Sequence, residues 1–79
     1  MSVYEAVSKA AIQVLGLEEA DLAELWELDL WDEGLIDSLG IVALIAKIEG
    51  FLEISIDLRK LKPENMLGFS TLKIAIENL

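Results

Sequence analysis

Apolar residues recur at helical intervals in two long stretches of the chain. In the first stretch, Ser2 and Glu5 have capping-box spacing and Gly16 ends the apolar run, so we expect a helix between these signals. In the second stretch, an Asp-Ser-Leu step precedes an apolar run over residues 38–52, which predicts a second helix. The apolar residues of the second helix cover more than one of its faces. The apolar positions are Tyr4, Val7, Ala11, Val14 and Leu15 in the first helix and Leu39, Val42, Leu44, Ile45, Ile48 and Leu52 in the second.

Residues 17–36, which join these helices, are acidic and rich in leucine. We predict a long loop here, with one short turn of helix at 20–25. Leu28, Leu30 and Trp31 are expected to anchor the loop to the core. For Trp31, the alternative is an indole that lines a pocket for a carried group. Loops of this length usually have a function.

After residue 52 the pattern predicts two further helices. Pro63 suits the first turn of a short helix that Gly68 ends, and Ser70 is a suitable cap for a last helix over residues 71–79. The period-two pattern at 53–58 is too short to indicate a strand in an otherwise helical chain. The expected buried residues of this part are Met66, Phe69, Leu72, Ile74, Ala75, Ile76 and Leu79.

The sequence therefore predicts one domain, residues 1–79, of the all-α class. The predicted architecture is a small four-helix bundle with a long acidic loop between helices one and two. A chain of 79 residues, 54% of them hydrophobic, can close one core but not a two-lobed enzyme cleft. Because the chain has neither cysteine nor histidine, it cannot form a Cys or His nucleophile or a zinc site of the usual ligands. We expect neither an enzyme nor a metal site.

The N-terminal residues 1–5 lack the basic region and the apolar core of a signal peptide, which predicts a cytoplasmic protein. Charged side chains at Lys47, Glu49 and Glu53 interrupt the apolar stretch 39–56. We therefore expect no membrane insertion.

The charge of the chain is unevenly distributed, with a net value of −9. No basic residue lies between Lys9 and Lys47. Such an acidic segment disfavours nucleic acid and favours partners with basic patches, although it could serve solubility alone. Four bases gather instead near the other end, where they could pair with the acidic loop or be solvated. The acids of the segment are Glu18, Glu19, Asp21, Glu24, Glu27, Asp29, Asp32, Glu33 and Asp37, and the bases are Arg59, Lys60, Lys62 and Lys73.

Ser38 is the residue that most needs explanation, because it stands at the start of the second predicted helix. Either Asp37 or Ser38 could cap the open amides at that end. A helix N-terminus carries partial positive charge, so a phosphate ester on Ser38 would be stabilised there. The alternative is that the hydroxyl only caps the helix.

The chain resembles the acyl carrier protein family over nearly its whole length. The resemblance rests on the order of its predicted helices, its acidic balance and the motif Asp37-Ser38-Leu39. It implies a bundle of acyl-carrier type in which Ser38 is esterified by 4'-phosphopantetheine, with Asp37 beside the attachment point. A phosphopantetheinyl transferase would transfer this group from coenzyme A. The protein would then carry an acyl or aminoacyl group as a thioester.

Two glycines separate this chain from the fatty-acid type of carrier. The stretch Trp31-Asp32-Glu33-Gly34-Leu35-Ile36-Asp37-Ser38-Leu39-Gly40 is similar to that of D-alanyl carrier proteins and some other stand-alone carriers. Residues 57–65 do not follow that branch and look more like a general acyl or polyketide-type carrier. The cargo therefore stays open among D-alanine, another amino acid, a fatty acid and a polyketide starter.

The resemblance also implies enzyme partners that read the second helix. They would be an adenylating ligase or acyltransferase that loads cargo and a downstream synthase or transferase. We expect Leu39, Val42 and Ala43 to contact these partners and Asp32 and Glu33 to guide their approach. The alternative for Val42 is a place in the core, with only Leu39 exposed. A carrier that visits several enzymes is expected to be a monomer.

A second class of function remains open. A small acidic helical adaptor could bind a partner helix in a groove and use Ser38 only as a cap. Modification by coenzyme A and a transferase separates the two classes.

Overall fold

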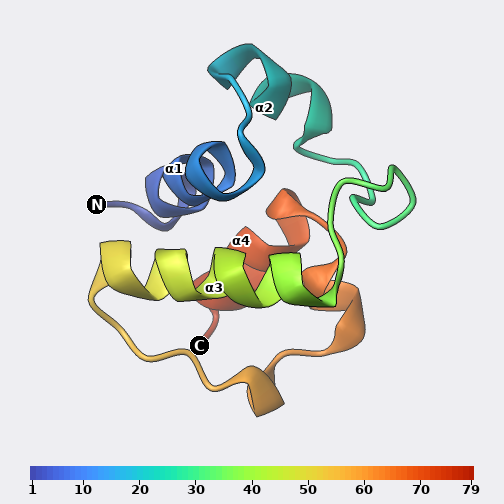
Figure 1. Cartoon of the computed structure of the whole chain (residues 1–79). Helices are drawn as coiled ribbons and strands as arrows, with labels where there is room; N and C mark the ends of the chain where they lie inside the picture. The colour runs from blue at the N-terminus through green and yellow to red at the C-terminus, as the bar shows by residue number, and fades with distance from the viewer.

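The computed structural model describes all residues, Met1–Leu79, and all of its regular secondary structure is helical. In Figure 1, α3 crosses the front of the molecule, α4 lies behind it, and α1 lies above them. Helix α1 contacts the other three α-helices. The all-α class is confirmed. The four α-helices are α1 (Val3–Leu15), α2 (Glu19–Leu25), α3 (Ser38–Leu52) and α4 (Phe69–Glu77), and two 3-10 helices, η1 (Leu58–Lys60) and η2 (Pro63–Met66), precede α4.

Helix α1 begins and ends at the predicted signals. Ser2 Oγ accepts a hydrogen bond from the Glu5 N–H at 3.1 Å, and Gly16 adopts a left-handed conformation with φ 68°. The buried face of α1 is formed by small side chains, which let the neighbouring helices approach closely. Tyr4 is 52% exposed, although it lies at one of the apolar positions of this helix. Its ring packs instead against Trp26, with 4.8 Å between ring centroids.

The short helical segment predicted at 20–25 within the loop 17–36 is present as α2, which begins one residue earlier. Its start is held by Asp21 Oδ2, which accepts a hydrogen bond from the Glu18 N–H at 2.9 Å. Helix α2 leaves residues 26–37 as the connection to α3. Leu30 is 1% exposed and anchors this connection as predicted, whereas Leu28 is 41% exposed and does not.

The connection is tied to the start of α4 by backbone hydrogen bonds. The Leu30 N–H donates to Leu67 O at 2.8 Å, and the Ser70 N–H donates to Trp26 O at 3.1 Å. Gly68 lies between these two bonds, and a side chain there would collide with the Leu28 carbonyl oxygen. A glycine at position 68 is therefore required by the close approach of the two segments.

Helix α3 has the predicted bounds and supplies much of the core. It ends at Glu53, whose φ is 55°. The chain then returns along the molecule, held by Glu49 Oε2, which accepts a hydrogen bond from the Ile56 N–H at 2.7 Å. The residues of α3 that are buried are Ile41, Leu44, Ile45 and Ile48.

The last helix differs from its prediction at both ends. Gly68, not Ser70, precedes α4, and Thr71 Oγ1 accepts a hydrogen bond from the Gly68 N–H at 3.2 Å. Ser70 thus lies inside the first turn. Ile74 and Leu79 are each 54% exposed, so their predicted burial is wrong.

The remaining predictions for this part of the chain agree with the structure. Leu72, Ile76 and Phe69 are buried, and Met66 and Ala75 pack against the core. The predicted short helix at Pro63 is the 3-10 helix η2, which ends before Gly68.

Two of the four basic residues near the C-terminal end, Arg59 and Lys73, form local ion pairs. Arg59 bonds Asp57 at 3.1 Å, and Lys73 bonds Glu77 at 3.0 Å. The hydrogen-bonded Arg59 guanidinium lowers the pKa of Asp57, and Asp57 in turn raises the pKa of Arg59. The possible pairing of these bases with the acidic loop is not observed, because each ion pair lies within two to four residues in sequence. None of the helices has the length and apolar character needed to cross a membrane.

Candidate functional site

Ser38 is the first residue of α3, and its side chain is exposed. The capping role belongs to Asp37, whose Oδ1 accepts a hydrogen bond from the Gly40 N–H at 2.7 Å. The Ser38 hydroxyl makes no hydrogen bond to another protein group. The alternative in which Ser38 itself caps the helix is therefore wrong, and its hydroxyl is free at the positive end of a 15-residue helix.

Gly40 provides the space that this cap needs. A Cβ at position 40 would lie 3.2 Å from Asp37 Oδ1 and 3.2 Å from Ile36 Cγ1. The Asp37 carboxylate can therefore fold over the start of the helix while Ile36 stays buried beneath it. The glycine that distinguishes this motif in the sequence thus has a packing reason.

The loop before Ser38 is shaped by a second aspartate. Asp29 Oδ1 accepts hydrogen bonds from the Trp31 N–H at 3.0 Å and from the Asp32 N–H at 3.1 Å. Gly34 then turns the chain with φ 70°. Asp32 and Glu33 are exposed at this turn, five or six residues before Ser38, so the approach to the serine carries negative charge.

An apolar groove begins at Ser38 and encloses about 510 Å³. No charged side chain lines it. Trp31 forms part of its wall, and the indole Nε1–H donates a hydrogen bond to Met66 O at 2.9 Å. The residues that line the groove are Trp31, Ser38, Ile41, Val42, Ile45, Leu58, Pro63, Met66 and Leu67.

Trp31 both fastens the loop and lines the groove. Its hydrogen bond to Met66 O fastens the loop to the η2 segment, and its ring lines the groove together with Ile41 and Val42 of α3. The indole is 40% exposed and lines the groove, so it is not a buried plug. The groove is not predictable from the sequence, because Leu58, Met66 and Leu67 come from segments that no local pattern relates to Ser38.

The predicted partner residues lie on the exposed side of α3. Leu39 is 82% exposed and Val42 is 50% exposed, and Ala43 is exposed beside them. The alternative that places Val42 in the core is wrong. Exposed apolar side chains grouped on one helix face are a feature of interaction surfaces.

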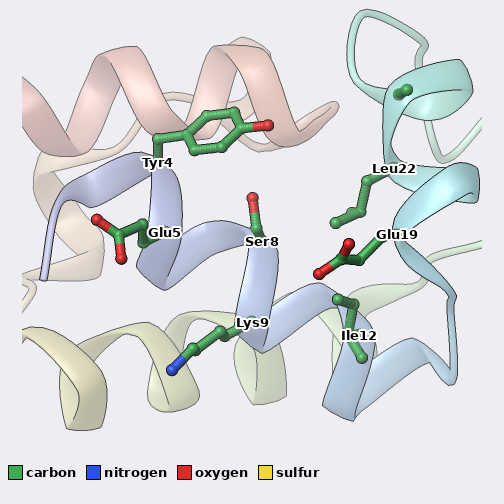
Figure 2. Close-up of a pocket in the computed structure, with 8 residues that line it drawn as sticks. Tyr4, Glu5, Ser8, Lys9, Ile12, Glu19 and Leu22 are labelled. Carbon is green, nitrogen blue, oxygen red and sulfur yellow. The ribbon is translucent and has the colours of Figure 1, made fainter.

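A second hollow, of about 400 Å³, lies between α1 and α2. Figure 2 shows side chains of both helices around it, among them Ser8 of α1 and Glu19 of α2. The Ser8 Oγ is buried without a hydrogen-bond partner. This hollow contains none of the residues that the sequence indicated. Its lining is Tyr4, Glu5, Ser8, Lys9, Ile12, Glu19, Leu22 and Ala23.

Comparison with known proteins assigns no family to the chain. No protein-family model matches it, no curated protein matches it in sequence, and no solved structure matches it. Inference about its function therefore depends on the geometry around Ser38.

Proposed function

We propose that this chain is a carrier protein whose Ser38 is modified with 4'-phosphopantetheine. The observation that carries the proposal is the arrangement at the start of α3. Asp37 caps the helix, and the exposed Ser38 hydroxyl makes no hydrogen bond within the protein. In this proposal the helical bundle is of acyl-carrier type, and the protein acts in the cytoplasm as a substrate of enzymes.

The residues around Ser38 are compatible with such a group. A phosphodiester on Ser38 would lie at the N-terminus of α3, where the helix dipole stabilises an anion. The groove that begins at Ser38 offers an apolar surface beside the attachment point. When bound, the group supplies a thiol, which this chain lacks.

The proposed modification is a phosphoryl transfer to Ser38. The Ser38 oxygen forms a bond to the phosphorus that bears pantetheine in coenzyme A. The P–O bond to adenosine 3',5'-bisphosphate breaks, and that leaving group keeps the electron pair. The proton of the Ser38 hydroxyl passes to a base of the phosphopantetheinyl transferase.

The exposed face of α3 is the proposed contact for enzyme partners. Leu39, Val42 and Ala43 lie beside Ser38 on one helix, so an enzyme that receives the serine would also cover them. Asp32 and Glu33 add negative charge, which would steer partners with basic surfaces. These partners would be the transferase, a ligase or acyltransferase that loads cargo, and a synthase or transferase that uses it.

Intact-mass measurement tests the proposal. The protein is incubated with coenzyme A and a phosphopantetheinyl transferase of broad specificity, beside a known carrier. We expect the wild type and Ser55→Ala to gain one phosphopantetheine group, because Ser55 is an exposed serine outside the site. Ser38→Ala should gain none. If the wild type gains no mass while the known carrier is modified, the proposal is wrong and a helical adaptor becomes the better account.

A further inference from the structure

The hollow between α1 and α2 is separate from the site around Ser38. It encloses about 400 Å³ and shares no lining residue with the groove beside the serine. Apolar side chains, among them Ile12 of α1 and Leu22 of α2, form part of its wall, and hydroxyl and charged groups form the rest. This mixture suits a ligand that has an apolar stem and a polar head.

Three polar groups of the hollow point toward the same space. Figure 2 shows the Tyr4 hydroxyl, the Ser8 hydroxyl and the Glu19 carboxylate directed into the space between α1 and α2. The Lys9 ammonium points away from it. The Glu19 carboxylate takes part in neither of the two ion pairs of the chain. Because a carboxylate only accepts hydrogen bonds and hydroxyl oxygens can accept them too, the polar head is expected to be a positively charged donor.

The Ser8 hydroxyl points to a ligand independently of this charge. Its oxygen is hidden from water and has no hydrogen-bond partner in the protein. A serine hydroxyl within a helix can bond the carbonyl of the preceding turn, but here it does not. A buried hydroxyl without a partner destabilises the fold. A donor that entered the hollow would provide the missing partner.

The openness of the hollow favours a side chain of another protein over a small molecule. Most of its lining residues are exposed, and Tyr4 is 52% exposed. Small-molecule sites usually bury most of the ligand, which this hollow cannot do, whereas a second protein would cover the rim. The exposed carboxylates of Glu18 and Glu24 add negative charge beside the hollow and favour a basic partner surface.

We propose that the hollow between α1 and α2 is a docking site for an arginine side chain of a partner protein. The guanidinium donates to the Glu19 carboxylate and to Ser8 Oγ, and the aliphatic stem packs against Ile12 and Leu22. A guanidinium suits the site better than an ammonium because its donors are spread over one plane and can reach both acceptors. The site does not depend on modification of Ser38, so a partner held here leaves the serine free for an enzyme.

Titration with capped amino acids, followed by NMR of the backbone amides, tests the proposal. The probe is N-acetylarginine methylamide. The control is N-acetylcitrulline methylamide, which has the same shape without the charge. We expect the arginine derivative to shift the amide signals of residues 4–12 and 19–23 and to bind at least about fivefold more tightly than the citrulline derivative.

Two substitutions on α2 give a matched pair. Glu19→Gln and Glu24→Gln each remove one negative charge from an exposed glutamate, but only Glu19 lines the hollow. Glu19→Gln should weaken binding of the arginine derivative by about fivefold or more, and Glu24→Gln by less than about twofold. Ser8→Ala should weaken binding without loss of thermal stability, because it removes a buried hydroxyl that has no partner.

Several results would overturn the proposal. Equal binding of the arginine and citrulline derivatives would mean that the charge is not recognised. Equal weakening by Glu19→Gln and Glu24→Gln would mean that the acidic surface as a whole attracts the probe. Tighter binding of free L-arginine than of the capped derivative would indicate a small-molecule site instead of a protein partner.

The docking site and the carrier function can fail separately. Ser38→Ala, which cannot receive phosphopantetheine, should bind the arginine derivative as the wild type does. Intact mass tests the carrier function without reference to the hollow. Loss of binding in Ser38→Ala would contradict the independence of the two sites.

Discussion

Both sides of α3 carry apolar side chains, but one side is buried and the other is exposed to water. Ile41, Leu44 and Ile48 on one side are 0–6% exposed, whereas Leu39 and Val42 on the other are 82% and 50% exposed. The buried side meets α1, whose small alanine side chains allow close packing. No element of the chain covers the other side at Leu39. Hydrophobicity alone therefore does not assign a residue of this helix to the core.

In the proposed function, the buried side of α3 stabilises the fold and the exposed side contacts enzyme partners. Exposed apolar side chains contribute little to folding and favour association. The exposed acids that precede Ser38 add negative charge at the start of this side. The comparison can be tested by substitutions that should affect only one side.

The largest expected effect is on the buried side. Leu44→Ala should reduce the free energy of unfolding by about 2–5 kcal/mol, because it leaves a cavity in a filled core. Val42→Ala on the exposed side should change it by less than about 0.5 kcal/mol. Urea denaturation followed by circular dichroism measures both. Equal losses for the two variants would mean that the sides do not differ in stabilising the fold.

The two sides of α3 begin at Ser38, and the Asp37 cap stabilises this end of the helix. Asp37→Ala should reduce the free energy of unfolding by about 0.5–2 kcal/mol, because the Gly40 N–H loses its acceptor. Asp37→Asn keeps a side-chain oxygen and should retain most of that stability. The same urea titration distinguishes them. If Asp37→Ala left the free energy of unfolding unchanged, the Asp37 cap would not stabilise the start of α3.

On the exposed side, Ala43→Glu should leave folding within about 0.5 kcal/mol of the wild type. It should raise the KM of phosphopantetheinyl transfer at Ser38 by about fivefold or more, which corresponds to about 1 kcal/mol of lost contact. Ala23→Glu, an exposed position on α2, is the matched control and should leave KM unchanged. Steady-state kinetics with varied carrier concentration measures this constant. An unchanged KM in Ala43→Glu would remove this position from the partner surface.

The smallest expected effect is at Gly50, near the end of α3. A Cβ at this position meets no atom within 4 Å, so Gly50→Ala should stabilise the protein by about 0.5–1 kcal/mol through helix propensity. Gly16→Ala should instead destabilise it, because Gly16 has φ +68°. Thermal denaturation compares the two. A loss of stability in Gly50→Ala would contradict the open space that the structure shows around a Cβ at this position.

Some features of the molecule depend on neighbours in sequence, and these were predictable. Ser2 and Gly16 bound α1, and the bounds 38–52 of α3 agree with the structure. The turn at Pro63 was also predictable. Caps, glycine stops and apolar periodicity act over three or four residues, so the chain alone determines them. The candidate serine could be identified for the same reason.

Other features were decided only by tertiary contacts. The close approach of residues 26–30 to 67–70 requires Gly68 and makes it, rather than Ser70, the residue before α4. Whether Tyr4, Leu28 or Ile74 is buried depends on which part of the chain covers each side chain. The apolar character of the residue does not determine this. At Ser38, the sequence by itself determined the residue and its place at a helix start. The tertiary structure decided that Asp37 takes the cap and that distant segments complete an apolar groove beside the free hydroxyl, because such a surface arises only when the folded chain brings them together.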